Sequence, residues 1–285
     1  MIDSMHDESK AAYRVAYQGE AGAYSEGAAI EALGQNIEPV PCQTFEDVFD
    51  ILKNEGVDRA VLPIENSLAG SIHRNYDLML RHDFHIVGEH GFRVRHNLMA
   101  LPGQTLTEIE EVLSHPQALS QCEHYLRALK VRIRPTYDTA GSAKLVRREE
   151  LHGAAAIASL RAAEVYNLEV LAEGIEDDPE NFTRFLILAG DPETPAEDVP
   201  AKTSIVFSLN DQPSVLFKAL SVFALRDIDL MKLESRPLRG RRWKYLFYMD
   251  FAGNVMEERA QNALRHLAEI APMLRVLGSY GRHEY

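Results

Sequence analysis

Short apolar segments alternate with amphipathic stretches along the first 190 residues, and this alternation restricts the possible folds more than any other feature. The apolar segments RVAY (14–17), PVPC (39–42) and RAVLP (59–63) are separated by helices predicted at 24–33 and 44–54. The second helix carries an apolar stripe at i, i+3, i+4 and i+7, formed by Phe45, Val48, Phe49 and Leu52. Strands that alternate with surface helices predict an α/β fold with a largely parallel sheet.

A second α/β series follows residues 84–101, where strand-like sequence continues without an intervening helix and predicts a crossover. Strands are expected near 111–114, 131–136, 154–158 and 169–173, helices near 116–129, 140–149 and 160–166, and a last apolar strand at 180–190. Two such lobes enclose a cleft where ligands bind. We therefore expect a two-lobed, periplasmic-binding-protein-like (type II) domain. Lobe 1 would cover about 14–88 and 176–190, and lobe 2 about 89–175.

An acidic, proline-rich segment, DPETPAEDVPAK (191–202), separates this domain from the rest of the chain. Three prolines in twelve residues disfavour a helix or a strand, so the segment is predicted to be a linker. The order over 203–283 is strand, helix, strand, strand, helix, strand, which predicts a ferredoxin-like βαββαβ unit. The polar residues 1–13 are predicted to be a disordered tail.

The chain carries a net charge of −13, from 30 Lys and Arg against 43 Asp and Glu among 285 residues. This balance argues against a nucleic-acid or anionic-membrane partner, because both are polyanions. The charge is uneven, since residues 1–200 carry −17 and residues 201–285 carry +4. We expect a cytosolic protein, because the two cysteines are isolated, MIDSMHDESKAAY is not a secretory signal, and no apolar run reaches about 18 residues.

Neither a nucleotide-binding nor a metal-binding motif is present in the sequence. The glycines of YQGEAGAYSEG (17–27) lie at a strand-to-helix turn, but their spacing fits neither the dinucleotide-binding fingerprint nor the P-loop. The three histidines within 82–90 lack the convergent ligands that a metal centre needs. We therefore expect no metal and no cofactor.

Four short strings fall at the ends of predicted strands, and three of them run into a helix. They are PIENSLAGS (63–71), SHPQALSQC (114–122), DTAGSAK (138–144) and ENFTRFLIL (180–188). Helix capping alone explains Ser, Thr and Asp at such places. Together, however, the strings supply uncharged hydrogen-bond donors, small residues and one cation, Arg184, around one cleft. This composition suits a small polyanion.

In this order the four strings resemble the prephenate dehydratase family, and the terminal unit with LESRP (233–237) resembles the ACT domain that follows it there. The resemblance covers about residues 14–280. It implies a lyase reaction of L-phenylalanine biosynthesis, in which prephenate loses CO2 and water and becomes phenylpyruvate. Aromatisation drives this reaction, so the resemblance implies neither a covalent intermediate nor a cofactor.

The resemblance also implies roles for residues in the four strings. Thr183 is the expected catalytic residue, which either donates a proton to the leaving hydroxyl or only orients it. Arg184 is expected to clamp a substrate carboxylate, or else to form a structural ion pair. Phe185 would pack on the substrate ring or in the core, and Glu65 is expected to be structural because it would repel a dianion. The other substrate-binding residues expected by resemblance are Asn66, Ser67, Gly70, Ser71, Gln117, Ala118, Thr139, Ala140 and Gly141.

By the same resemblance, the ACT domain binds phenylalanine at a dimer interface, which implies feedback inhibition and a homodimer or homotetramer. The expected ligand-binding residues are Pro213, Ser214, Val215, Leu216, Phe217, Leu220, Glu234, Ser235, Arg236 and Pro237. The chain departs from the family pattern at Ser214, where a glycine is expected, and a side chain there could crowd the ligand. The apolar residues over 215–220 also fit the core of an amphipathic helix.

Two other functions fit the sequence. Arogenate dehydratase performs the same chemistry on the amino-acid analogue of prephenate, and VLFKALSVFALRDIDL and YLFYMDF resemble plant arogenate-type sequences. A non-catalytic amino-acid-binding protein would share the two-lobed fold. The absence of an export signal and the Thr-Arg-Phe string at 183–185 favour an enzyme over such a protein.

Overall fold

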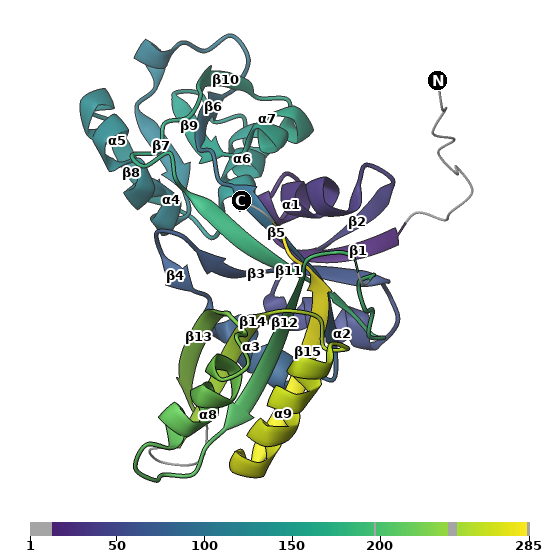
Figure 1. The fold of residues 1–285 in the computed structure, drawn as a ribbon. Coiled ribbons are helices and arrows are strands. Elements are labelled where there is room, and N and C mark those ends of the chain that lie inside the picture. The colour runs from purple at the N-terminus through teal and green to yellow at the C-terminus, as the bar shows by residue number, and fades with distance from the viewer. Residues whose placement is uncertain (1–12, 197, 239–243, 284–285) are drawn as a thin grey trace, which may run out of the picture. The chain divides into compact units, whose positions relative to one another are not determined.

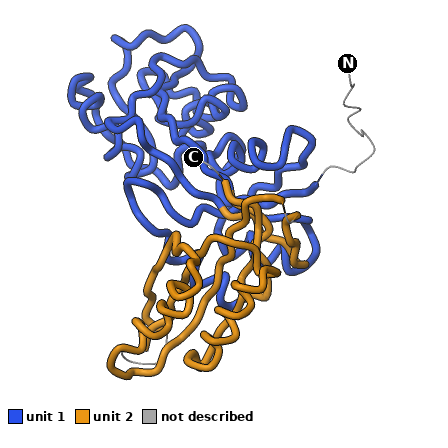
Figure 2. Tube along the Cα trace, viewed as in Figure 1, with its two compact units in different colours: residues 1–81, 90–185 blue, residues 82–89, 186–285 orange. Residues whose placement is uncertain are grey.

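The computed structural model describes residues 13–196, 198–238 and 244–283, and the chain divides into two compact units (Figures 1 and 2). Unit 1 comprises Met1–Arg81 and His90–Phe185, and unit 2 comprises His82–Glu89 and Leu186–Tyr285. The division passes through two strands, β5 (His85–Arg93) and β11 (Phe182–Ala189). Of the predicted tail, Tyr13 belongs to a strand and the other residues lie outside the described part of the chain.

The first sheet corresponds to the first predicted α/β series and has the strand order β2-β1-β3-β11-β5. Strand β1 pairs in parallel with both β2 and β3, as the alternation of strands and helices predicts. Besides β5 and β11, the first sheet contains β1 (Tyr13–Gln18), β2 (Ile37–Cys42), β3 (Arg59–Asn66) and the short β4 (Gly70–Ser71), which pairs with β3. The helices of this lobe are α1 (Tyr24–Leu33), α2 (Phe45–Lys53) and α3 (His73–Arg81).

The second sheet has the strand order β10-β6-β9-β7-β8 and is mixed rather than parallel. Strand β7 pairs in parallel with β8 and β9, whereas β6 pairs antiparallel with β9 and β10. The strands are β6 (Asn97–Ala100), β7 (Glu111–Ser114), β8 (Arg132–Pro135), β9 (Ala154–Ala158) and β10 (Glu169–Ala172). The helices are the 3-10 helix η1 (Leu106–Glu108), α4 (Pro116–Gln121), α5 (Glu123–Leu129), α6 (Thr139–Arg148) and α7 (Leu160–Tyr166).

Local capping explains where several helices begin. Thr44 forms a capping box with Asp47 at the start of α2, and Pro116 occupies the first turn of α4.

Two predictions of helices differ from the structure. The helix predicted at 116–129 is interrupted at Cys122, whose φ of −120° and ψ of 25° are not helical, and no helix was predicted where α3 lies. The segment carries apolar residues at i, i+3 and i+4, namely Tyr76, Met79 and Leu80, so its pattern is that of an amphipathic helix.

Unit 2 contains a four-stranded antiparallel sheet in the order β13-β14-β12-β15, against which α8 and α9 pack. Its elements are β12 (Ala201–Ser208), α8 (Val215–Ala224), β13 (Leu230–Pro237), β14 (Tyr245–Ala252), α9 (Glu258–Ile270) and β15 (Met273–Gly281). This βαββαβ order and the two-sheet architecture of the first domain confirm the predicted fold class. Strand β12 begins at Ala201, inside the segment predicted to be a linker.

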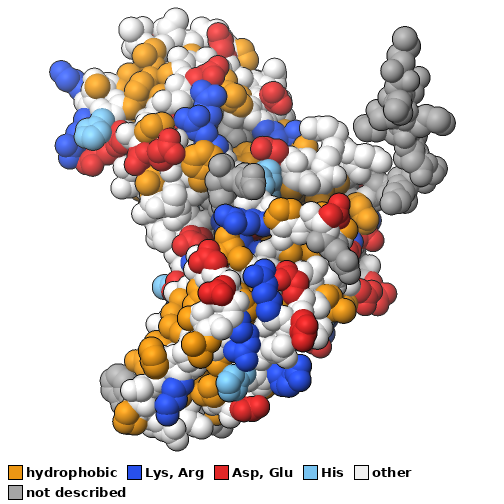
Figure 3. Space-filling model, viewed as in Figure 1, with side chains coloured by type: hydrophobic (Ala, Val, Ile, Leu, Met, Phe, Trp, Pro, Cys, Tyr) orange, Lys and Arg blue, Asp and Glu red, His pale blue; other side chains and the backbone are white. Residues whose placement is uncertain are grey.

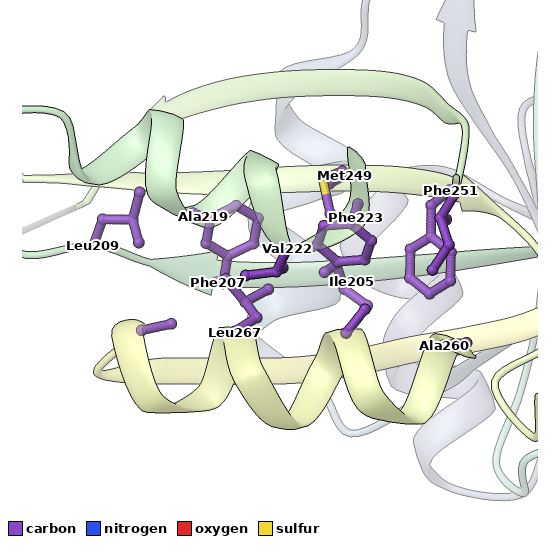
Figure 4. Packing of buried hydrophobic residues seen from close by; sticks show 13 residues of the cluster. Ile205, Phe207, Leu209, Ala219, Val222, Phe223, Met249, Phe251, Ala260 and Leu267 are labelled. Atoms are coloured by element: carbon purple, nitrogen blue, oxygen red, sulfur yellow. The ribbon is translucent and has the colours of Figure 1, made fainter. Parts of the chain in front are cut away.

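Apolar side chains from both helices and the sheet form the core of this four-stranded layer (Figure 4). Phe207 stacks on Phe247 with ring centroids 5.5 Å apart, and Phe223 lies 5.1 Å from Phe251. Burial of such large rings supplies much of the stabilisation that a small domain needs.

Segment 82–89 is attached to the sheet of unit 2 by polar contacts. Arg275 donates from Nη2 to the carbonyl oxygen of Phe84 at 3.1 Å. The buried Lys202 ammonium lies 2.6 Å and 2.8 Å from the two carboxylate oxygens of the buried Glu89. A Cβ at Gly278 would collide with the backbone of Ile86, so glycine permits the close approach of β15 to this segment.

Charged side chains of both signs are interspersed on the face drawn in Figure 3, so the net negative charge does not gather there into one patch. Within the described residues, no helix combines the length and the apolar character needed to cross a membrane.

Candidate active site

A cavity of about 440 Å³ lies within unit 1 and is lined by residues from the lobe of the first sheet and from the lobe of the second sheet. All four strings singled out in the sequence contribute to it. Its lining is mostly neutral, and comprises Gln18, Gly19, Ala23, Tyr24, Ser25, Thr44, Phe45, Pro63, Asn66, Ile72, Arg74, Val94, His96, His115, Gln117, Ala118, Gln121, Tyr137, Asp138, Thr139, Thr183 and Phe185. This volume suits a small-molecule ligand.

The Thr183 hydroxyl is held at the start of β11 by the side chain of Asn66 at the end of β3. Asn66 donates from Nδ2 to Thr183 Oγ1 at 3.0 Å, and also approaches the carbonyl oxygen of Phe182 at 3.1 Å. Both side chains are buried, with 6% of Asn66 and 7% of Thr183 exposed. Because Oγ1 accepts a hydrogen bond from Asn66, the hydroxyl proton is left to donate to another group.

A second buried side chain of the lining, His96, lies just before β6. Its Nδ1 is 2.8 Å from the hydroxyl oxygen of Tyr24, and its Nε2 is 2.8 Å from Gln121 Oε1. Burial lowers the pKa of His96, although the hydrogen bond to Gln121 and the charge of Glu176 act in the opposite direction. The imidazole is therefore favoured in its neutral form.

Asp138 is the acidic residue of the lining and the N-cap of α6. Its Oδ1 accepts a hydrogen bond from the backbone N–H of Gly141, where a Cβ would lie 2.8 Å from the same oxygen. Within the described part of the chain, Oδ2 accepts no hydrogen bond. Burial raises the pKa of Asp138, and the hydrogen bond from Gly141 only partly offsets it. The site therefore contains a carboxylate with one oxygen open to a ligand.

The cation of the lining is Arg74, in the first part of α3, and not the predicted Arg184. Arg184 lies between Thr183 and Phe185 on β11, and successive residues of a strand point to opposite faces, so its side chain lies on the other side of the strand. Arg74 makes a two-pronged contact with Glu46, from Nε to Oε1 at 3.0 Å and from Nη2 to Oε2 at 2.5 Å. Burial alone would raise the pKa of Glu46, but the hydrogen bonds from Arg74 outweigh it and lower the pKa.

The other predicted substrate-binding residues divide into two groups. Asn66, Gln117, Ala118, Thr139 and Phe185 line the cavity with Thr183. The second group lies next to the lining without belonging to it, and consists of Ser67, Gly70, Ser71, Ala140 and Gly141. Ser67 connects β3 to β11, because its Oγ donates to the carbonyl oxygen of Glu180 at 2.7 Å and accepts from the N–H of Phe182 at 3.0 Å.

Several lining residues were not predicted as site residues. Four of them, Tyr24, His115, Gln121 and Asp138, lie within the short motifs of the sequence, as does Asn181 beside the lining, so the neighbouring motif residues are the signal that could have indicated them. His96 and Arg74 lie outside those strings, and no local pattern distinguishes them. Among the described residues, no group of three His, Cys, Asp or Glu side chains is arranged to hold a metal ion.

The sequence profile of the prephenate dehydratase family matches residues 15–193. The chain belongs to the prephenate dehydratase family. An Arabidopsis thaliana relative named arogenate dehydratase/prephenate dehydratase 2, chloroplastic, is 55% identical over 276 residues, which cover 94% of this chain and 72% of that protein. The family assignment confirms the resemblance found in the sequence and makes the protein a member of a dehydratase family.

Several solved structures match nearly the whole chain, including an acylase and a prephenate dehydratase. GqqA, described as a novel type of quorum-quenching acylase, is 34% identical with a TM-score of 0.89, over 95% of this chain and 98% of that one. The prephenate dehydratase of Arthrobacter aurescens, solved in complex with L-Phe, is 29% identical with a TM-score of 0.87, over 94% of this chain and 90% of that one. The family fold therefore includes the C-terminal unit.

The prediction of a cytosolic protein is wrong by this comparison, because the Arabidopsis relative is chloroplastic. That prediction rested on the first residues of the chain, on its cysteines and on the lack of a long apolar run, and none of these properties distinguishes the cytosol from another reducing compartment such as a plastid.

The residues predicted to bind phenylalanine lie at the start of α8 and on the edge strand β13. Ser214 precedes α8 with a φ of +61°, a left-handed conformation that favours glycine, the residue expected there by resemblance. Val215, Leu216 and Leu220 pack against the core, whereas 72% of Phe217 is exposed. Leu233 and Tyr245 are also exposed, and hydrophobic side chains gather over β13 and α8 in Figure 3.

Proposed function

We propose that this protein is a dehydratase that removes CO2 and water from prephenate or from arogenate, which makes it a carbon-oxygen lyase. The observation that carries the proposal is the Thr183 hydroxyl, which lines the cavity and accepts a hydrogen bond from Asn66. Family membership supports the same reaction, and a relative at 55% identity is named for both substrates.

In the proposed reaction the ring carboxylate leaves as CO2, and the electrons of the broken C–C bond become part of the aromatic ring. The ring C–O bond breaks at the same time, and its oxygen leaves with the electron pair. The Thr183 hydroxyl accepts from Asn66 and keeps its proton for another group, so it can donate to the leaving hydroxyl and stabilise the charge that develops there. With one proton from solvent, the products are CO2, water and the aromatic acid.

The lining residues from the predicted set are proposed as the substrate site, in which Gln117 and Thr139 donate hydrogen bonds and Phe185 contacts the ring. Carboxylate binding is proposed for Arg74, because Arg184 lies outside the lining. We also propose the predicted division into a catalytic domain at 14–190, a linker from residue 191 and a C-terminal ACT domain, with the linker ending at residue 200 because β12 begins at Ala201.

Arogenate is the second candidate substrate, and Asp138 favours it. Arogenate carries an ammonium group where prephenate carries a keto group, and Asp138 supplies the carboxylate of the lining with Oδ2 open. A partly buried carboxylate gains more from a cation than from a neutral carbonyl, because the cation compensates its lost hydration.

The substitution Asp138→Asn tests this preference, because asparagine also caps helices but carries no charge. We expect kcat/KM for arogenate to fall tenfold or more while kcat/KM for prephenate changes by less than threefold, since loss of one partner of a charge pair costs about 2–5 kcal/mol. Equal losses for both substrates would contradict the assignment of Asp138 to the ammonium group.

For the C-terminal unit we propose that phenylalanine binds at 213–220 and 234–237 and lowers activity, and that the units pair in a homodimer or homotetramer. The exposed apolar side chains Phe217, Leu233 and Tyr245 support pairing on this side of unit 2. A relative at 29% identity was solved with L-Phe bound. Phenylalanine titration followed by activity and by small-angle scattering tests both statements, and unchanged rate and scattering would contradict them.

The test of the main proposal is incubation of the protein with prephenate and, separately, with arogenate, with detection of phenylpyruvate or phenylalanine. We expect aromatic product from at least one substrate, and from both if the named relative is a guide. Absence of product from both would overturn the proposed function.

A further inference from the structure

A continuous series of hydrogen bonds connects Tyr24 with Thr183, and we call it the His96 network. Asn181 links the contacts of His96 to those of Asn66. Its Nδ2 lies 3.2 Å from Gln121 Oε1, and its Oδ1 lies 2.8 Å from Asn66 Nδ2. Asn181 is fully buried, and 2% of His96 is exposed. The members, in order, are Tyr24, His96, Gln121, Asn181, Asn66 and Thr183.

Two backbone amides fix the direction of the hydrogen bonds from Asn66 to the Nε2 of His96. The N–H groups of Leu68 and Ala69 lie 3.1 Å and 2.9 Å from Asn66 Oδ1. A backbone N–H can only donate, so the Asn66 atom that it meets must be the amide oxygen. The other amide atom, Nδ2, is therefore a donor toward Thr183 and Asn181.

The orientation of Asn66 also fixes which imidazole nitrogen of His96 carries a proton. Asn181 presents its oxygen to Asn66 and hence its Nδ2 to Gln121, so Gln121 presents Oε1. An oxygen acceptor facing His96 requires a proton on Nε2. Nδ1 of the neutral ring then accepts from the Tyr24 hydroxyl. The carbonyl oxygen of Arg95, 2.9 Å from the same hydroxyl, is its alternative acceptor.

We propose that His96 is a positioning residue for the reaction proposed above. Its Nε2–H holds Gln121 and, through Asn181, keeps the Asn66 amide on Thr183 Oγ1, so that the Thr183 proton remains available to the substrate. The inference rests on the proposed function and adds to it a residue outside the predicted set. His96 lines the cavity, but both ring nitrogens have protein partners, so it acts through Thr183 rather than on the substrate.

The charged and titratable groups around His96 agree with this role. The carboxylate of Glu176 accepts a hydrogen bond from the His96 backbone N–H at 2.8 Å, and Tyr24 has a raised pKa because it is buried. Cys122, whose pKa is raised by burial, is near Tyr24. The Nε2–H exists in both the neutral and the protonated imidazole, so the positioning role predicts no pH dependence of its own.

Substitution of His96 by glutamine or by leucine tests the proposal. The Nε2 of glutamine can occupy the place of the imidazole Nε2 and donate to Gln121, whereas leucine cannot. We expect His96→Leu to lower kcat roughly 10- to 100-fold with little change in KM, because small displacements of a catalytic group cost about this much. His96→Gln should stay within about fivefold of wild type, with a superimposable pH profile. The matched control is His152→Leu, because His152 is an exposed histidine of the same unit.

A double variant separates positioning from general damage to the fold. If His96 acts through Thr183, adding His96→Leu to Thr183→Ala lowers kcat by less than twofold. Three results would each overturn the proposal: kcat of His96→Leu within twofold of wild type, an equal loss in His96→Gln, or an undiminished effect of His96→Leu in the Thr183→Ala background.

The tautomer provides a measurement that does not depend on activity. Nitrogen NMR of histidine side chains should find His96 protonated on Nε2 and unprotonated on Nδ1, and a Nδ1-protonated ring would overturn the network. If wild type turns over neither prephenate nor arogenate, the proposed function fails in that assay, while the tautomer still decides the arrangement of the network.

Discussion

The two units use buried polar groups differently. In unit 1 the buried groups that hold Thr183 are neutral, namely the amides of Asn66 and Asn181 and the imidazole of His96, and they bond to one another, to Gln121 and Tyr24, and to backbone groups. In unit 2 the buried pair is charged, because Lys202 and Glu89 face each other on neighbouring segments. A neutral network can orient a hydroxyl toward a ligand without adding a charge to the site. In an ion pair the two charges compensate each other, and the pair of Lys202 and Glu89 holds β12 against β5.

Removal of the hydroxyl at the end of the network should give the largest effect. We expect Thr183→Ala to lower kcat about 10²- to 10⁴-fold with substrate binding largely retained, because the leaving hydroxyl loses its donor. Thr183→Ser, which keeps the hydroxyl, is the matched control. Steady-state kinetics and ligand titration measure both, and a Thr183→Ala rate within twofold of wild type would remove Thr183 from the chemistry.

Disruption of the ion pair in unit 2 should act on stability rather than on turnover. Lys202→Met removes the ammonium that faces the buried Glu89 carboxylate, so this charge loses its cation while it keeps the hydrogen bond from the His283 backbone N–H, and we expect the free energy of unfolding to fall by about 3–5 kcal/mol. The double variant with Glu89→Gln should recover most of this loss. Denaturant unfolding measures the change, and a single variant as stable as wild type would show that the pair contributes nothing.

The dependence of kcat/KM on acidic pH tests the role of the Asp138 carboxylate. The pKa of Asp138 is raised, so this carboxylate takes up its proton at a higher pH than an ordinary aspartate. We therefore expect kcat/KM for arogenate to decline on acidification before that for prephenate, since protonated Asp138 cannot attract an ammonium group. The ratio of the two constants, measured from neutral to acidic pH, should be flat in Asp138→Asn.

The smallest effect is expected at the left-handed residue of unit 2. Ser214→Gly removes the side chain from a φ of +61°, which relieves backbone strain but makes the unfolded chain more flexible. The free energy of unfolding should therefore change by less than about 1 kcal/mol, while inhibition by phenylalanine strengthens if the serine crowds the ligand. A weaker inhibition by phenylalanine would contradict that crowding.

Much of the fold follows from local patterns. The apolar stripe at Phe45–Lys53, the proline at the start of α4 and the βαββαβ order of unit 2 all appear in the structure where the sequence predicted them. The mixed second sheet did not follow, because strand direction depends on how β6 and β10 return to β9 and not on their composition. The break at Cys122 likewise depends on one backbone conformation within an otherwise helical sequence.

The sequence by itself determined the two α/β series, the C-terminal unit and the four strings from which Thr183, Asn66, Gln117 and Thr139 reach the cavity. Only the tertiary structure decided which cation lines it and which groups orient Thr183. Arg184 adjoins Thr183 in sequence but points to the opposite face of the strand. His96 is connected to Thr183 only through Gln121, Asn181 and Asn66, which lie 25 to 85 positions from it in the sequence. Strand alternation is local and can be anticipated, but a hydrogen-bond network exists only after distant elements have packed together.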